Sequence, residues 1–171
     1  MLPNKAMEKL TKAQVCAILD YEPETGIFRW KERRTRNHYI QAGKIAGFNT
    51  TWGYYGLRIN ERQYMAHRVA WLVMTGEWPP VGFEIDHIDL NKRNNAWTNL
   101  RLATTSQNHA NTKTYSRSGF KGVRRRGSKY TAEIVFHRKS IYLGTFLTPE
   151  EAHAAYMKVA RKLHGEFARA S

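Results

Sequence analysis

The chain has 171 residues, of which 42% are hydrophobic, and it carries 28 Lys and Arg against 14 Asp and Glu, giving a net charge of +14 and a pI near 10.1. This length suits one compact domain or two small ones, and the excess of positive charge is typical of a protein that binds a polyanion. Cys16 is the only cysteine, which excludes a disulfide framework and a four-cysteine zinc site.

The N-terminal segment predicts a short helix followed by a strand. Thr11 and Gln14 fit a capping box for a helix over residues 11–19. The EPETG segment predicts a turn, and the next four residues, IFRW, predict a strand over 27–30. Three arginines follow, and we interpret them as a DNA phosphate-contacting arm, with a solvated charged loop as the alternative: Arg33, Arg34 and Arg36.

Strands over residues 42–47 and 53–59 are predicted next, and a turn at Asn60 leads into a hairpin. Apolar residues then recur at helical spacing from Ala66, and Gly76 predicts the end of this helix. His67 opens the helix, and we interpret it as a structural residue rather than a catalyst.

The C-terminal part predicts a small sheet with one helix. A polar segment over residues 112–119 reads as a linker. The segments FKGVRRR, KYTAEIVF and KSIYLGTF then predict three strands with tight turns. Thr148, Pro149 and Glu151 form a strong helix start, and Gly165 predicts its end.

The stretch over residues 84–111 contains the chemistry. Asp86 and His87 lie in an apolar strand, and an Asn-rich loop and a second strand over 100–103 follow. Thr104 and Gln107 predict a capped helix with Asn108 in its first turn. Carboxylate and amide oxygens suit Mg²⁺, and the pKa of an unperturbed histidine, near 6.5, suits a general base. We therefore predict a metal-dependent hydrolytic site.

Two details of this site remain open from the residues alone. Neighbouring side chains on a strand face opposite sides, so a bend is needed to bring Asp86 and His87 to one centre. Asn99 could hold either the His87 ring or the loop by hydrogen bonding. We expect no zinc, because one cysteine and dispersed histidines do not form a tetrahedral site.

The stretch resembles the HNH family of ββα-metal endonucleases, in the form found in phage and intron homing enzymes. The resemblance rests on HRVAWL, IDHIDLN, NNAWTNLRLAT and SQNHAN. It implies that Asp86 and Asn108 bind Mg²⁺ or Mn²⁺, that His87 is the general base, and that Asn99 supports the loop and His87. His109 is the alternative to Asn108 as a ligand, and Leu90 stands where the family often has glycine.

The C-terminal part resembles the Apetala-two/ethylene-response-factor DNA-binding domain, through GVRRR, KYTAEI, YLGTF and the helix from TPEEA. This resemblance implies a sheet that reads the major groove of DNA. Val135 stands where plant members commonly have a contacting arginine, so base preference is not transferred. The residues at matching positions, which we expect to contact DNA, are Arg124, Arg126, Lys129, Tyr130, Glu133 and Tyr142.

We predict an α+β protein: a ββα-metal HNH nuclease core with N-terminal strands, plus a small three-stranded antiparallel sheet and one helix at the C-terminus. The predicted divisions are an N-terminal DNA-contacting region (1–78), a nuclease core (79–112), a linker (113–119) and an Apetala-two-like domain (120–171).

The predicted function is a site-directed, homing-type endonuclease that nicks double-stranded DNA, and the alternative is a non-catalytic, sequence-specific DNA-binding regulator. We expect a monomer or homodimer. No signal peptide or membrane-spanning run is seen, so we expect a cytoplasmic protein, in the host cell if it is phage-encoded, with no membrane partner.

Overall fold

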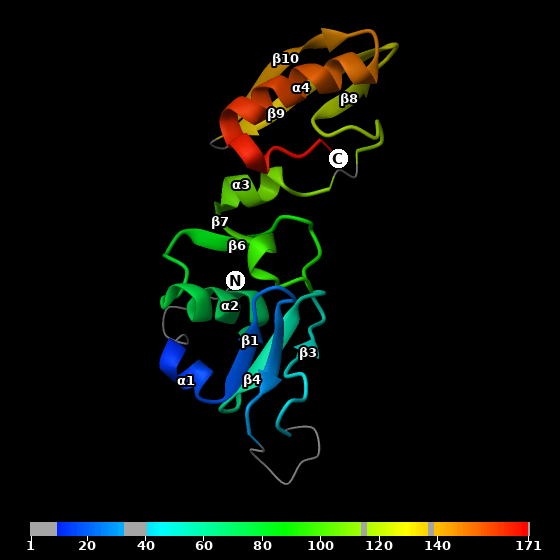
Figure 1. Cartoon of the computed structure of the whole chain (residues 1–171). Helices are drawn as coiled ribbons and strands as arrows, with labels where there is room; N and C mark the ends of the chain where they lie inside the picture. The colour runs from blue at the N-terminus through cyan, green and yellow to red at the C-terminus, as the bar shows by residue number, and fades with distance from the viewer. Residues whose placement is uncertain (1–9, 33–40, 114–115, 137–138, 171) are drawn as a thin grey trace. The chain divides into compact units, whose positions relative to one another are not determined.

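The computed structural model describes residues 10–32, 41–113, 116–136 and 139–170 (Figure 1). The chain divides into two compact units, Met1–Leu102 (the N-terminal unit) and Ala103–Ser171 (the C-terminal unit). Within the described ranges, no helix is both long and apolar enough to cross a membrane. The predicted four-part division of the chain stays a prediction.

The N-terminal unit begins with α1 (Lys12–Cys16), β1 (Leu19–Glu22) and β2 (Ile27–Trp30). Thr11 caps α1 through the predicted capping box with Gln14. The prediction that the helix continues to residue 19 is wrong. Leu19 is 2% exposed and pairs with Trp30 in the antiparallel β1–β2 hairpin, so Leu19 is buried as part of a strand and not of a helix.

A three-stranded antiparallel sheet follows, made of β3 (Phe48–Asn49), β4 (Tyr55–Ile59) and β5 (Arg62–Met65). The predicted continuous strand over 42–47 is wrong: Ile45 forms an isolated bridge with Arg29, and backbone hydrogen bonds join the segment to Phe28 and Trp30 without forming a regular strand. Gly43 and Gly47 have φ values of +77° and +125°, which are incompatible with a continuous strand.

Helix α2 (Ala66–Thr75) and the two-stranded sheet of β6 (Phe83–His87) and β7 (Leu100–Thr104) complete the part of the chain that leads to the site. Gly76 ends α2 in a left-handed conformation, as predicted. A short 3₁₀ turn, η1 (Trp97–Asn99), precedes β7. The core joins these elements through buried side chains that include Phe28, Leu57, Ile59, Val69, Leu72, Ile85 and Leu100.

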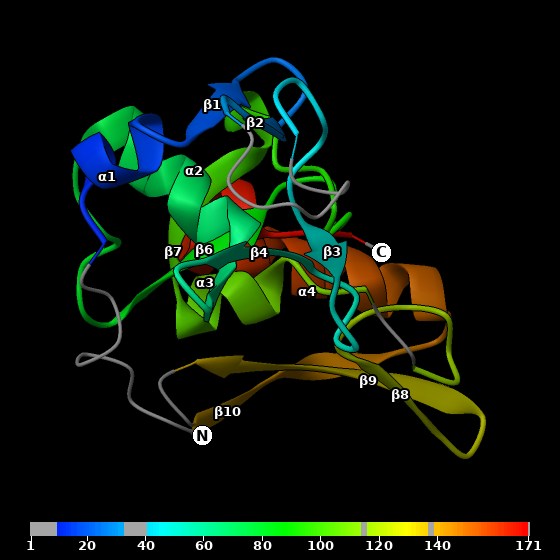
Figure 2. The ribbon, with the colours of Figure 1, turned by 90° about the horizontal axis from the view of Figure 1, so that it is seen from below.

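The C-terminal unit contains α3 (Thr105–Ala110), β8 (Val123–Arg126), β9 (Lys129–Phe136), β10 (Lys139–Phe146), α4 (Pro149–His164) and the short η2 (Gly165–Phe167). The strands form an antiparallel sheet with β9 in the centre, and α4 lies along one face of it (Figure 2). Ala132 and Ile134 pack there against Ala152 and Tyr156. The predicted α+β class and the C-terminal sheet with one helix are confirmed.

Candidate active site

Strand β6 ends in two buried polar side chains. Asp86 is 3% exposed and His87 is 5% exposed, although the sequence predicts that neighbouring side chains on a strand face opposite sides. Buried polar groups of this kind need hydrogen-bond or charge partners, because an uncompensated charge in the interior is costly. The partners come from β7 and from the loop between the two strands.

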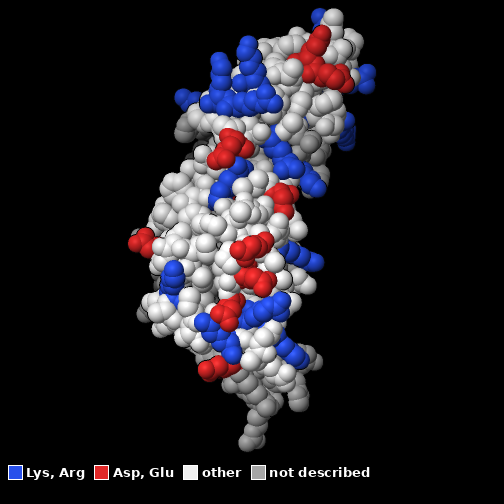
Figure 3. Space-filling model, viewed as in Figure 1, with Lys and Arg blue, Asp and Glu red and all other residues white. Residues whose placement is uncertain are grey.

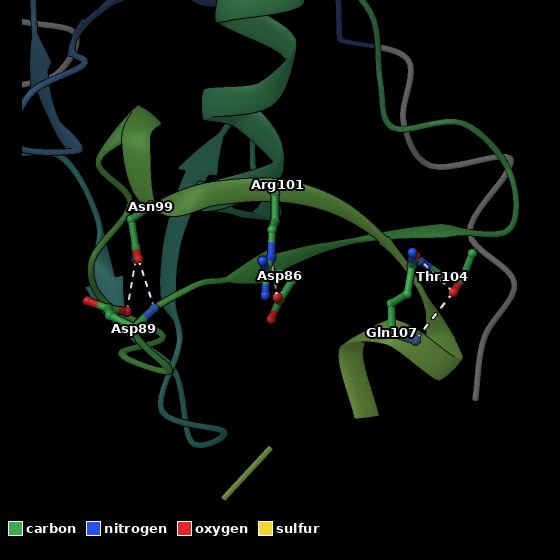
Figure 4. A network of polar contacts seen from close by, with 6 residues as sticks. All are labelled: Asp86, Asp89, Asn99, Arg101, Thr104 and Gln107. Atoms are coloured by element: carbon green, nitrogen blue, oxygen red, sulfur yellow. Dashed lines mark hydrogen bonds and ion pairs between the residues drawn. The ribbon is translucent and has the colours of Figure 1, made fainter. Parts of the chain in front are cut away.

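Asp86 forms an ion pair with Arg101 of β7, and Nε of Arg101 lies 2.9 Å from Oδ2 of Asp86 (Figure 4). The Arg101 side chain is 13% exposed, so both charges are shielded from solvent. This charge-assisted contact fixes one carboxylate oxygen of Asp86.

His87 is held by Asn95. The distance between Nε2 of His87 and Oδ1 of Asn95 is 3.2 Å, and Asn95 is 1% exposed. Nδ2 of Asn95 donates to the carbonyl of Arg93, so the amide oxygen is the atom that faces the imidazole. This arrangement assigns the ring hydrogen to Nε2 and leaves Nδ1 as the basic nitrogen.

The pKa of His87 lies below its ordinary value. Burial lowers it, while the contact with Asn95 and the charges of Asp89 and Asp86 act in the opposite direction. The lowered pKa keeps the imidazole neutral at pH 7, so His87 can accept a proton there.

The loop after β6 is built around Asp89 and Asn99 (Figure 4). Oδ1 of Asn99 accepts from the Asp89 amide at 3.0 Å, and Nδ2 donates to Oδ1 of Asp89 at 2.9 Å and to the Asn94 carbonyl at 2.8 Å. Of the two tasks considered for Asn99, the structure therefore shows the loop-holding one. Hydrogen bonds from Asn91 and Asn94 lower the pKa of Asp89, although its partial burial acts to raise it.

Leu90 has a φ of +66°, in the left-handed region. This is the position where the family often has glycine, which adopts that conformation without steric cost, whereas other L-residues pay about 1–2 kcal/mol. The loop therefore keeps the backbone shape that glycine would give, and the contacts of Asp89 and Asn99 hold it.

The β1–β2 turn supports the loop from the other side. The Tyr21 hydroxyl donates to the carbonyl of Asn95 at 2.7 Å, and the Trp97 amide donates to the carbonyl of Pro23 at 2.8 Å. Gly26 lies directly against the backbone of Asn95, with no room for a Cβ atom. The residue that holds His87 is thus fixed by a hairpin some seventy positions earlier in the chain.

His67 and Tyr54 surround the His87 ring. The ring centroids of His67 and His87 are 5.1 Å apart, and those of Tyr54 and His87 are 6.1 Å apart. Nδ1 of His67 is buried without a hydrogen-bond partner. Burial, with smaller contributions from His87 and Arg68, lowers the pKa of His67 from 6.5 to about 3.

The buried His67 predicts acid sensitivity. The unfolded chain protonates His67 near pH 6.5 and the folded chain only near pH 3, so its contribution to stability is complete above pH 6.5 and is lost as the pH falls towards 3. Between pH 7 and pH 5 this loss amounts to about 2 kcal/mol. We expect His67→Phe to reduce the drop in unfolding free energy between these two pH values by that amount, as measured by urea denaturation.

The exposed His109 provides the control, since His109→Ala leaves the wild-type pH dependence in place. An identical drop in stability for wild type and His67→Phe would show that His67 is not the buried neutral base described here.

Helix α3 carries Asn108 and His109. Thr104 caps it, and Gln107 completes the predicted capping box by accepting from the Thr104 amide at 2.8 Å (Figure 4). Nζ of Lys121 donates to three carbonyls at the other end of the helix, those of His109, Ala110 and Thr112. Asn108 is half-buried and His109 is exposed. The choice between them as metal ligand stays open.

The predicted DNA-contacting residues are distributed unevenly. Arg33, Arg34 and Arg36 lie outside the described residues. On the C-terminal sheet, Tyr130 is on the α4 side and packs against the core there. Alternation and register place the other five on the opposite face: Arg124, Arg126, Lys129, Glu133 and Tyr142. Figure 3 shows Lys and Arg side chains gathered over the C-terminal unit.

Sequence reasoning missed Arg101 and Asn95, the partners of Asp86 and His87. Arg101 is one charged residue in the strand LRLAT, and Asn95 is one of several asparagines in NKRNN. A charged residue between two apolar strand residues was the only signal available for Arg101. Among the described residues, no group of three or more His, Cys, Asp or Glu side chains could hold a metal ion.

Comparison with known proteins identifies relatives for both parts of the chain. A family model for the HNH endonuclease matches residues 64–110. The uncharacterized HNH endonuclease L560 of Acanthamoeba polyphaga mimivirus is 38% identical over 103 residues, 60% of this chain and 54% of that protein. The ethylene-responsive transcription factor ERF117 of Arabidopsis thaliana is 46% identical over 69 residues, 39% of this chain and 20% of that protein.

The chain thus spans about half the length of the first relative and a fifth of the second. The structure described as DNA binding and cleavage by the HNH homing endonuclease I-HmuI has a TM-score of 0.40 and 20% identity, covering 86% of this chain and 85% of that one, a likeness too distant to assign a fold.

Protein 3.8 of Escherichia phage T7 is 33% identical over 116 residues, 60% of this chain and 87% of that protein. The match to the HNH model runs over His67, β6, the Asn-rich loop, β7 and α3. Taken together, the family model and the mimivirus relative show that the chain contains an HNH endonuclease domain over residues 64–110.

Proposed function

We propose that the protein is a metal-dependent, homing-type endonuclease that nicks double-stranded DNA, with His87 as general base and Asn99 as the residue that holds its loop. The observation that carries the proposal is His87 itself: a buried imidazole, neutral at pH 7, with Nε2 on Asn95 and Nδ1 as its basic nitrogen, beside the carboxylate of Asp86. The net charge of +14 supports DNA as the substrate.

In the proposed reaction, water attacks the phosphorus of a phosphodiester, and Nδ1 of His87 takes the proton that the water gives up. The bond between phosphorus and the 3′ oxygen breaks, and the 3′ oxygen takes a proton from solvent water, which leaves a 5′ phosphate and a 3′ hydroxyl. Asn95 holds the imidazole in the tautomer that this transfer requires, and Asn99 holds the loop.

Asp86 and Asn108 are the proposed metal ligands. A carboxylate and an amide oxygen fit a hard cation such as Mg²⁺ or Mn²⁺, which takes oxygen ligands and usually keeps several waters. When bound, such an ion supplies stabilisation of the negative charge on the phosphate and the leaving oxygen. Arg101 orients the Asp86 carboxylate through the ion pair.

The test is the conversion of supercoiled plasmid. We expect nicked circles with Mg²⁺ or Mn²⁺ and none with EDTA, since the reaction needs the divalent ion. The same assay decides between the two candidate ligands: Asn108→Ala is expected to raise the metal concentration for half-maximal nicking, and His109→Ala is expected to leave it unchanged. The reverse result would make His109 the ligand.

A second candidate function is a DNA-binding regulator without nuclease activity. The 46% identity to a transcription factor over 69 residues supports it, as do the basic residues on the sheet face opposite α4. Specific retardation of plasmid fragments, without nicking under either metal, would favour this function.

The endonuclease proposal also includes a cytoplasmic location and a monomer or homodimer as the active form.

A further inference from the structure

The turn between β3 and β4 is tightly hydrogen-bonded. The Thr50 amide donates to the carbonyl of Tyr54 at 2.9 Å, and the Tyr54 amide donates to Oγ1 of Thr50 at 3.1 Å. The Gly53 amide also donates to the carbonyl of Thr50, at 3.1 Å. The backbone at the tip of this turn is therefore fixed before any ligand binds.

Trp52 lies at the tip, and its side chain is 74% exposed. Of the other four tryptophans, Trp30 is 7% exposed, and Trp71, Trp78 and Trp97 are half-buried. An exposed indole on a rigid turn gives up the burial that normally stabilises tryptophan, and it adds no packing to the core. The position is well suited to a contact with something outside the chain.

Lys92 connects this turn to the active site. Its Nζ lies 3.5 Å from the Trp52 carbonyl and 4.6 Å from the centroid of the Tyr54 ring. Tyr54 in turn lies beside His87, with 6.1 Å between the ring centroids. Lys92 belongs to the loop that the hydrogen bonds of Asp89 and Asn99 hold. Lys92 and Tyr54 therefore link the exposed indole of Trp52 to the imidazole of His87.

We propose that Trp52 stacks on a base of the DNA duplex next to the phosphate that is cut, with Lys92 on a neighbouring phosphate. This inference rests on the proposed nuclease function and names a contact that positions the substrate. Aromatic and apolar side chains that enter a base step partly unstack it, and the unstacked base is stabilised on the ring. The contact of Lys92 with the Trp52 carbonyl is long, so the ammonium can turn to a phosphate oxygen without losing a strong hydrogen bond.

Duplex DNA fits this surface better than a protein partner does. The indole is accompanied by a cation and by a chain with twice as many basic as acidic residues, which is the combination that binds stacked bases and phosphates together. A protein partner would leave the affinity for DNA independent of Trp52, which the experiment below detects.

The test compares Trp52→Ala, Trp52→Phe and the control Val81→Ala, which removes another apolar side chain, 77% exposed, from the N-terminal unit. Loss of one stacked base predicts that Trp52→Ala binds duplex DNA about 5- to 150-fold more weakly. We expect Trp52→Phe to recover most of this loss and Val81→Ala to bind like wild type. All three are expected to keep the wild-type urea midpoint, because both positions are exposed.

Fluorescence gives the readout that a merely structural role would not move. Iodide quenches the exposed Trp52 in wild type, and DNA is expected to remove that quenching. A duplex with 2-aminopurine as the neighbour of the base that stacks on Trp52, so that it loses a stacking partner, should brighten with wild type and Trp52→Phe, and stay dim with Trp52→Ala.

If Trp52→Ala bound duplex DNA with wild-type affinity and brightened 2-aminopurine as much as wild type does, the inference would be overturned, while plasmid nicking by wild type would still support the proposed function. Binding without nicking by wild type would overturn the proposed function and, with it, the placement of Trp52 beside a cut phosphate. Failure of wild type to bind duplex DNA would overturn both.

Discussion

His87→Ala is expected to lower the rate of metal-dependent plasmid nicking about 100- to 10,000-fold, the range that a general base contributes. The imidazole is neutral at pH 7 because burial lowers its pKa, and Asn95 holds it in the tautomer with a basic Nδ1. Alanine leaves no group that can take the proton from water. The rate is measured in single-turnover reactions with saturating enzyme, so that weaker DNA binding does not contribute.

Two controls separate chemistry from folding. His87→Asn keeps a polar side chain in the buried site and is expected to be as inactive as His87→Ala, with a urea midpoint closer to wild type. His153→Ala removes a half-buried histidine of the C-terminal unit and is expected to nick at the wild-type rate. Equal nicking by wild type and both His87 variants, at equal DNA affinity, would show that another group is the base.

The elements that sequence predicts well are those whose signals are local. The caps at Thr104 and Thr148 form as predicted because each capping box joins residues only three positions apart. The turn at Asn60 and Glu61 has positive φ at both residues, which matches the hairpin that the polar turn predicts.

The parts that sequence misses depend on partners far along the chain. Leu19 has the spacing of a helix face, but the hairpin with β2 gives it a better partner in Trp30. Arg101 becomes a site residue only because β6 and β7 pair, and Asn95 only because the loop turns its amide towards His87. Neither contact produces a periodic pattern in the sequence. The sequence therefore predicts the Asp, His and Asn residues of the candidate site and misses the residues that hold them.

The nuclease motif includes residues from both compact units. The HNH match over residues 64–110 crosses the boundary between the two compact units, and α3 falls in the C-terminal one. There Ala103 and Ala110 share a small core with Phe167, and Lys121 binds the end of the helix. Burial lowers the pKa of Lys121, with a smaller contribution from Arg169. The helix with Asn108 therefore depends for its stability on the segment that resembles a DNA-binding domain.

Gly26→Ala is expected to be the most damaging small substitution in the N-terminal unit. A Cβ atom at Gly26 would overlap the backbone carbon of Asn95 and the backbone nitrogen of Ala96, and would lie 2.6 Å from the Asn95 carbonyl oxygen. Backbone cannot move aside as a flexible side chain can, so the loop that holds His87 must shift. We expect a loss of at least about 3 kcal/mol beyond the cost of the left-handed backbone itself, together with most of the nicking activity.

Gly43→Ala is the matched control, because Gly43 has nearly the same φ, +77° against +73°, and no atom lies within 4 Å of a Cβ built there. It is expected to cost only the strain of a left-handed alanine, about 1–2 kcal/mol, and to nick DNA like wild type. Urea denaturation gives the stability difference, and single-turnover nicking at a temperature where both variants are folded gives the effect on the site. Equal losses in both variants would show that backbone conformation alone, and not the support of Asn95 by the β1–β2 turn, is what Gly26 provides. A larger loss of stability and nicking in Gly26→Ala than in Gly43→Ala would mean that residues 23–26 determine the position of His87 as much as strand β6 does.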